Sequence, residues 1–124
     1  MQTTFKPHAL TTEHAVNAYP PGGANAYAFR LKIRRVYRDE VWTDRWYIEW
    51  RSQRLSHTGT WDHLPDPDLV DIDQWCAVHE YDENVALARA AAIAPTLTIM
   101  GHSIAEVWAS EQESITKRTA AGPS

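Results

Sequence analysis

The residues best suited to metal chemistry are His57, His63, Cys76 and His79, which follow the spacing H-x5-H-x12-C-x2-H. Imidazole and thiolate are the ligands that zinc prefers, and four of them could close a tetrahedral site. However, the chain has no C-x-x-C pair, and a strand predicted over residues 74–81 would point Cys76 and His79 to opposite faces. Only a helix would bring such i, i+3 side chains together. The zinc signal is therefore weak, and we expect no metal or other cofactor.

A serine beside a histidine, in Gly101-His102-Ser103, is the nearest approach to a nucleophilic motif. A nucleophile elbow requires G-x-S-x-G, but Ala105 stands where the second glycine belongs. Ser103 fits better as the first residue of an S-x-x-E capping box that ends at Glu106. The other candidate nucleophile, Cys76, is of a type that is usually a small buried apolar residue. We therefore expect a protein that is not an enzyme.

Acidic residues gather in one segment, since residues 62–83 hold eight of the sixteen Asp and Glu side chains and no Lys or Arg. A calcium loop would need a glycine at its turn and a distant bidentate glutamate, and the proline-rich segment 65–68 has neither. We interpret the segment as a solvated acidic loop that can engage basic residues of a partner. The carboxylates assigned to this role are Asp66, Asp68, Asp71 and Asp73.

Basic residues gather in a neighbouring segment, since residues 30–54 hold eight of the twelve Lys and Arg side chains. Cations beside an aromatic ring on an open strand face are typical of proteins that bind single-stranded nucleic acid. The net charge of −4 argues against simple coating of nucleic acid by bulk charge. Nucleic-acid binding is therefore the alternative hypothesis, with a predicted site at Arg30, Lys32, Arg34, Tyr47 and Arg51.

Two of the six tryptophans are less easily buried than the rest, because Trp42 lies in the link of the predicted hairpin and Trp61 lies beside the predicted turn at 57–60. Exposed tryptophan with arginine nearby is typical of the residues that dominate protein–protein interfaces. A core role for both side chains is an equally open interpretation. We assign Trp42 and Trp61, together with the four aspartates of the acidic loop, to a partner-binding site.

Period-two alternation predicts two strands that form an antiparallel hairpin, one over residues 27–34 and one over residues 45–51. The alternation slips at residues 35–37, which predicts a bulge or bend. A short strand is expected at 61–64 and another at 74–81, although a helix over 69–79 remains an alternative. One helix is predicted to begin at Asp82 and end before Pro95, and a second to begin at Ser103. Residues 97–100 are expected to form an edge strand or an extended link.

The element order β-β-(β)-β-α-(β)-α predicts an α+β fold, in which two C-terminal helices pack on one face of an antiparallel sheet of three to four strands. We expect a single domain at residues 26–116, a flexible N-terminal arm at 1–25 and a flexible tail at 117–124. One cysteine, no secretory signal and no long apolar run predict a cytoplasmic protein without a membrane span.

Three function classes follow, in order of preference. The first is a non-enzymatic module that binds another protein, as a monomer or homodimer, in the manner of the inhibitors and immunity-type accessory proteins that phages and mobile elements encode. The second is a single-stranded nucleic-acid-binding domain. The third is a small enzyme or a zinc-stabilised domain.

Overall fold

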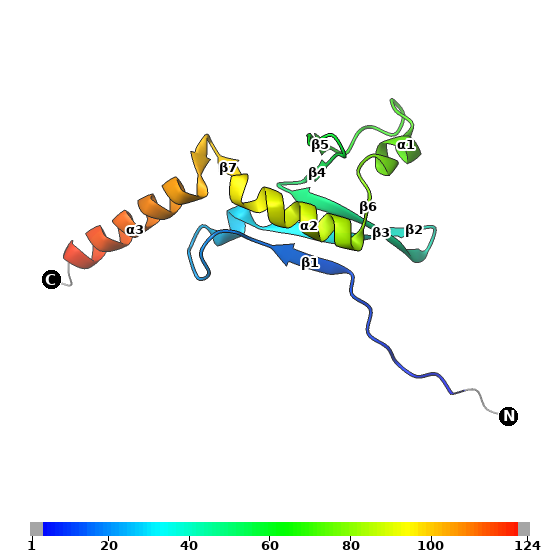
Figure 1. Cartoon of the computed structure of the whole chain (residues 1–124), viewed down its shortest axis with the longest axis horizontal. Coiled ribbons are helices and arrows are strands. Elements are labelled where there is room, and N and C mark those ends of the chain that lie inside the picture. Colours follow the sequence, from blue (N-terminus) through cyan, green and yellow to red (C-terminus); the bar gives the residue numbers. More distant parts are fainter. Residues whose placement is uncertain (1–3, 122–124) are drawn as a thin grey trace.

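An antiparallel sheet organises the molecule in the computed structural model, which describes residues 4–121 (Figure 1). Five strands follow one another in chain order, and β6 pairs with β3 on the same edge as β4. The predicted α+β fold with its antiparallel sheet is confirmed, with six strands in place of three to four. The strands are β1 (Glu13–Val16), β2 (Leu31–Arg38), β3 (Val41–Trp50), β4 (Gln53–Leu55), β5 (Trp61–His63) and β6 (Tyr81–Asp82).

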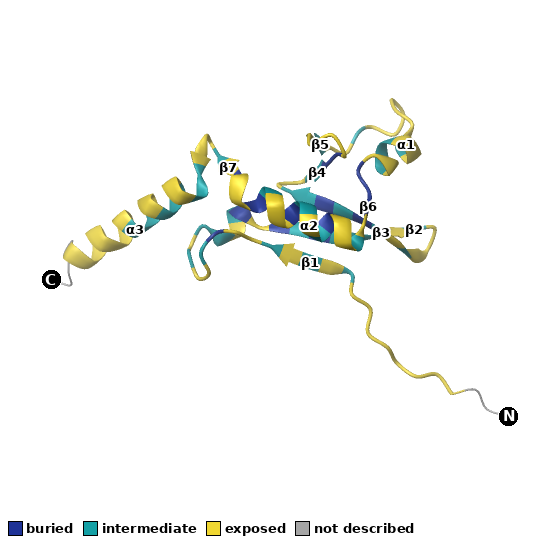
Figure 2. Cartoon of the chain, viewed as in Figure 1, coloured by how far each residue is buried: buried dark blue, intermediate teal, exposed yellow. Residues whose placement is uncertain are grey.

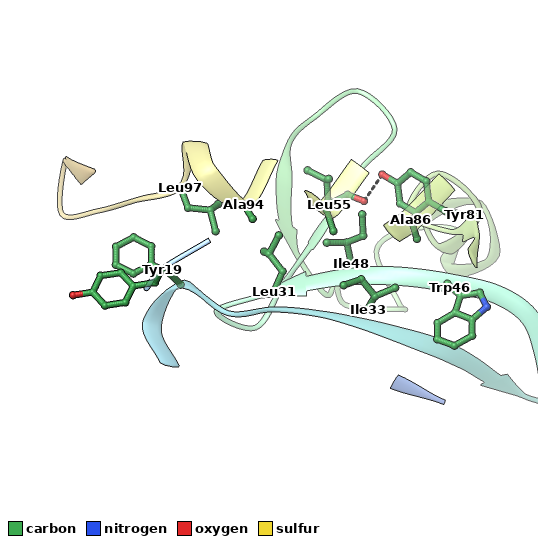
Figure 3. Packing of buried hydrophobic residues seen from close by; sticks show 12 residues of the cluster. Tyr19, Leu31, Ile33, Trp46, Ile48, Leu55, Tyr81, Ala86, Ala94 and Leu97 are labelled. Atoms are coloured by element: carbon green, nitrogen blue, oxygen red, sulfur yellow. Dashed lines mark hydrogen bonds between the residues drawn. The ribbon is translucent and has the colours of Figure 1, made fainter. Parts of the chain in front are cut away.

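The alternation of β2 and β3 builds the core. Leu31 and Ile33 on β2 and Ile48 on β3 are fully buried, and Trp46 is nearly so (Figure 3). Each buried leucine or isoleucine contributes about 1.5–3 kcal/mol. The predicted irregularity at residues 35–37 is present as a register shift. Arg35 and Tyr37 lie two residues apart on β2, whereas their partners on β3, Trp46 and Trp42, lie four residues apart.

Helix α2 (Glu83–Ile93) covers this apolar face. One side of α2 is buried and the other exposed (Figure 2). Its contact surface is alanine, because Ala86 and Ala90 are fully buried and so is Ala94, the first residue of the 3-10 turn η2 (Ala94–Thr96). The absence of larger side chains at these three positions lets the helix backbone approach the sheet closely. The predicted start at Asp82 and end before Pro95 are confirmed.

Helix α3 (Ile104–Ala121) lies beyond the end of the sheet rather than over it, after the hairpin of β7 (Thr98–Ile99) and β8 (His102–Ser103) (Figure 1). Of the two helices expected on one face, only α2 lies there. The predicted capping box is present, because the Ser103 amide donates to Glu106 and the Glu106 amide donates to the Ser103 hydroxyl. Residues 117–121, expected in the tail, continue α3, and residues 122–124 lie outside the described chain.

The apolar stripe of α3 is too short for a second layer on the sheet. Val107 and Trp108 pack against the core, and the Trp108 ring meets Tyr19 edge-on at 5.7 Å. One turn further, the Glu111 carboxylate accepts from the Tyr19 hydroxyl and from the Asn25 backbone and side chain, at 2.7–3.0 Å. Residues 113–120 are exposed on all sides, so α3 is fixed through its first half only.

The N-terminal segment differs from the loose arm expected at residues 1–25. Residues 13–16 form β1 against β2, and Tyr19 is buried with its ring stacked on Phe29 at 5.3 Å. A four-residue strand offers too little alternation to be recognised in the sequence. Residues 27–29, expected in the first strand, lie in the 3-10 turn η1 (Ala26–Phe29) instead. Residues 4–11 are exposed, and residues 1–3 lie outside the described range.

The strand favoured at residues 74–81 is wrong, because residues 72–77 form helix α1 (Ile72–Ala77). The Asp71 carboxylate caps this helix by accepting from the amides of Asp73 and Gln74 at 3.1 and 3.2 Å. This local capping outweighs the strand preference of the aromatic and β-branched residues that follow. No helix in residues 4–121 is long and apolar enough to cross a membrane.

Two tight turns connect β2 to β3 and β3 to β4, and both place ordinary residues in the left-handed region. Asp39 and Glu40 have φ of 53° and 65°, and Arg51 and Ser52 have φ of 51° and 65°. Positive φ at both positions is the geometry of a type I′ turn, for which Asn-Gly and Asp-Gly are the preferred pairs. Each turn therefore carries strain that a glycine at its second position would remove.

We expect Glu40→Gly to raise the free energy of unfolding by roughly 0.5–1 kcal/mol. Glycine relieves about 1–2 kcal/mol of strain in the folded state, because it adopts positive φ freely. Part of this gain is lost, because glycine also increases the conformational entropy of the unfolded chain. Denaturant titration measures the change. The matched control is Ala88→Gly at an exposed site in α2, which should lower the free energy by about 1 kcal/mol. Equal destabilisation by both substitutions would contradict a strained turn.

Candidate functional site

A hollow with a volume of about 650 Å³ lies beside the β2–β3 hairpin. Residues from β1, β2, β3, β4 and α1 line it, together with the segment that leads into the acidic loop. We call it the arginine pocket, after the four guanidinium groups in its lining. Its charged and aromatic members are Glu13, Arg34, Arg35, Arg38, Arg54, Tyr37, Trp42 and Tyr47.

Two of these cations, Arg34 and Arg54, keep unused hydrogen-bonding capacity. The Arg54 guanidinium lies 3.8 Å over the Tyr47 ring and has no carboxylate within 4 Å among the described residues. Arg34 has only loose ion pairs, with Glu13 at 3.6 Å and Glu49 at 3.8 Å. The Nε atoms of both arginines are buried without a hydrogen-bond partner in the described part of the chain.

An unsatisfied buried donor costs about 1–3 kcal/mol, so each Nε leaves its side chain with an unmade hydrogen bond inside the pocket lining. Partial burial works against the charge of Arg34, yet Glu49, the Tyr47 hydroxyl and Glu13 raise its pKa. The guanidinium therefore stays protonated in the pocket. Planar guanidinium groups match carboxylate and phosphate oxygens, so the pocket is suited to an anionic group.

The other two arginines are already engaged. Arg38 forms an ion pair with Glu80, whose side chain is buried. Arg35 donates to the backbone carbonyl of Thr43 and to the Asp44 carboxylate at 3.1 Å. These two side chains shape the wall, whereas Arg34 and Arg54 can receive a ligand.

Aromatic side chains stand at the hairpin end of the pocket. Tyr37 and Trp42 meet edge-to-face with ring centroids 5.0 Å apart, and they remain 57% and 45% exposed. Val41 beside them and Leu64 in the opposite segment are 58% and 59% exposed. Such an apolar patch next to unsatisfied cations is unusual for a surface that meets only water.

The predicted acidic loop adjoins this pocket, because Leu64 and Ile72 at its two ends are both lining residues. Asp66 and Asp71 are occupied with the local backbone, Asp66 by accepting from the Asp68 amide at 2.9 Å and Asp71 as the cap of α1. Asp68 and Asp73 are exposed and form no ion pair within residues 4–121. The arginine pocket therefore lies next to an acidic loop.

The two tryptophans assigned to partner binding lie in different environments. Trp42 is half exposed in the arginine pocket. Trp61 is partly buried, packs against the core and lies 5.7 Å from the Trp50 ring. Trp42 is accordingly available to a partner, whereas Trp61 supports the end of the sheet.

The proposed zinc ligands have separate partners. The ring of His57 bonds the Glu80 carbonyl, that of His63 bonds Gln53, and that of His79 bonds Asp62. Cys76 lies on α1 and lines the arginine pocket. The described residues contain no group of three or more His, Cys, Asp and Glu that could hold a metal. Residues 72–77 are helical, so Cys76 and His79 are not separated onto opposite faces of a strand as predicted.

The predicted nucleic-acid set divides between two places. Arg34 and Tyr47 belong to the arginine pocket, where Arg54 covers one face of the Tyr47 ring. Arg30, Lys32 and Arg51 line a second hollow of about 480 Å³. The sequence also missed Arg54 and Tyr37, because Arg54 follows an unrecognised turn and Tyr37 follows the register shift.

Comparison with known proteins found no matching family model, curated relative or solved structure. The geometry of the site therefore carries the functional argument alone.

A buried hydrogen-bond chain holds the pocket wall in place. The His79 ring is stacked on Trp75 at 3.8 Å, and it bonds the Trp75 carbonyl and the Asp62 carboxylate at 2.6 and 2.8 Å. This chain ties the end of α1 to β5. The hydrogen bond from His79, with further help from the Thr60 hydroxyl, lowers the pKa of Asp62 although partial burial opposes the shift.

We expect Asp62→Asn to lower the free energy of unfolding at neutral pH by about 1 kcal/mol, because a charge-assisted hydrogen bond on a partly exposed carboxylate is lost. A lowered pKa stabilises the fold above the unfolded-state pKa, and this stabilisation disappears as the pH falls through the folded-state pKa. Thermal unfolding from about pH 7 to about pH 3 should therefore show the gap to wild type closing.

Asp68→Asn is the matched control, since Asp68 is exposed and unpaired among the described residues; it should match wild type throughout. A gap for Asp62→Asn that stays constant with pH would show that the carboxylate acts through its shape and not through its charge.

Proposed function

We propose that the protein is a non-enzymatic module that binds another protein through the arginine pocket. The observation that carries this proposal is the half-exposed Tyr37–Trp42 pair at the end of a cavity lined by Arg34, which is only loosely paired, and by Arg54, which has no carboxylate within 4 Å among the described residues. Aromatic residues and arginine are enriched among the few residues that dominate interface energies. Their convergence from β2, β3 and β4 puts a rigid framework behind the surface.

The charges favour a partner of complementary pattern. A carboxylate of the partner would satisfy Arg34 and Arg54, while the acidic loop beside them would meet a basic residue. Two patches of opposite charge at one site attract the partner and also fix its orientation, since a partner bound in the reverse direction would place like charges together. The apolar ring of Trp42 would supply most of the affinity by leaving water.

An inhibitor or immunity-type accessory role fits this description. The chain is small and acidic. Its exposed surface offers the side chain of Trp42 and the acidic loop as contacts for a partner, rather than a group of catalytic side chains. The single cysteine suits a reducing compartment, and we place the interaction in the cytoplasm.

We expect Trp42→Ala to weaken binding of the partner about thirtyfold or more, the equivalent of 2 kcal/mol for an interface anchor. A photo-reactive amino acid at position 37 first identifies the partner by cross-linking, and calorimetry with the purified partner measures the loss. Arg54→Glu should also weaken binding, mainly through faster dissociation, because it removes a cation that pairs with the partner's carboxylate.

Tyr27→Ala provides the aromatic control, because Tyr27 is 74% exposed and lies outside the arginine pocket. It should bind as wild type does, and a photo-reactive group at position 27 should not capture the same protein. Full affinity of Trp42→Ala, or equal capture from both positions, would rule out the pocket as the interface.

A further inference from the structure

The second hollow lies where β2 begins and where the turn joins β3 to β4, away from the arginine pocket. We call it the turn hollow. Its volume is about 480 Å³, and it combines three cations with two aromatic rings. These residues are Tyr27, Arg30, Lys32, Trp50 and Arg51.

The three cations of the turn hollow, Arg30, Lys32 and Arg51, have no hydrogen-bond acceptor and no carboxylate within 4 Å in the described chain. Glu49 is the one acidic residue among the lining residues, and it already lies 3.8 Å from Arg34. Three like charges around one cavity repel one another, and an anion placed among them would relieve that repulsion.

The aromatic rings add a second kind of contact. The Trp50 indole is fixed, because its Nε1 donates to the Ala28 carbonyl at 2.9 Å and its ring packs against the core. Arg51 lies 5.7 Å over that ring, and Tyr27 presents a ring that is 74% exposed. Flat aromatic surfaces next to cations accept the base and the phosphate of a nucleotide, respectively.

Backbone geometry keeps Arg51 at this place. Arg51 and Ser52 occupy the two left-handed positions of the β3–β4 turn, and Trp50 pairs with Gln53 immediately beyond it. A non-glycine residue at positive φ persists only when the surrounding structure holds it there. Arg51 is thus fixed at the turn, close to the beginning of β2 and Arg30.

We propose that the turn hollow is a nucleotide-binding site, in which Arg30, Lys32 and Arg51 hold the phosphate and the rings of Tyr27 and Trp50 receive the base. The ligand is a nucleotide unit, either free or within a single strand. This site shares no lining residue with the arginine pocket, so the nucleotide-binding proposal can be tested independently of the protein-binding proposal.

The test uses the full chain at low salt with two probes, adenosine monophosphate and a short fluorescein-labelled single-stranded oligodeoxythymidine. Anisotropy measures the oligonucleotide, and the indole resonance of Trp50 in a nitrogen–proton spectrum reports the mononucleotide. We expect Arg30→Glu combined with Arg51→Glu to weaken binding about tenfold or more and to reduce the salt slope by about two. Tyr27→Ala should weaken it about fivefold through lost stacking.

The control is Lys117→Glu combined with Arg118→Glu, which makes the same change in net charge on exposed residues of α3. It should bind as wild type does, within about twofold, because surface charges more than a screening length away contribute little. Thermal unfolding confirms that all variants are folded.

Binding of both probes assigns a nucleotide site, whereas binding of the oligonucleotide alone assigns a strand site; either result supports the proposal. Two results would overturn it. One is failure of both probes to bind at low salt, and the other is equal weakening by the two double charge reversals.

Discussion

The alternation of β2 and β3 is the constraint on which the rest of the structure depends. Leu31, Ile33, Trp46 and Ile48 commit one face of this strand pair to the core, and the alanines of α2 fit that face closely. The period of a strand is two, so the intervening residues Lys32, Arg34, Tyr47 and Glu49 must lie on the opposite face. A register slip of one residue would bury four polar side chains and expose the core. The core and the charged surface are therefore set by the same register.

The charged surface becomes a pocket only through elements that pack from outside the strand pair. Helix α1 supplies one wall, and it depends on the Asp71 cap and on the bond between His79 and Asp62. Strand β4 supplies Arg54, whose guanidinium stacks on Tyr47 because Glu49 and Arg54 are cross-strand partners. The ion pair of Arg38 with buried Glu80 links the hairpin to the segment before β6. These contacts place Arg34 and Arg54 in the lining of one pocket in spite of their like charge.

Local signals in the sequence were enough to predict the elements with strong periods or caps. The β2–β3 hairpin, the α2 boundaries and the Ser103–Glu106 capping box all follow from residues near one another in the chain. Strand β1 and helix α1 could not be predicted in the same way. β1 is only four residues long and is held by its pairing with β2, and α1 depends on a cap whose signal was weaker than the strand preference around Trp75. The arginine pocket was harder still to predict from the sequence, because its lining residues are spread from 12 to 76 and no single segment contains enough of them.

The positive charge of residues 30–54 does not form one continuous stripe on the folded protein. Glu49 lies between the two groups of cations, facing Lys32 across the strands and lying within 3.8 Å of Arg34. Glu13 approaches Arg34 from β1, and Arg54 covers the Tyr47 ring that an extended nucleic-acid platform would need. A surface that coats nucleic acid requires an uninterrupted row of cations, since each phosphate lies close to the next along the strand. The interruptions instead leave two separate cavities of different chemistry. One cavity has an aromatic anchor beside an acidic loop. The other has a fixed indole and three cations that form no ion pair within residues 4–121, so each cavity suits a different kind of ligand.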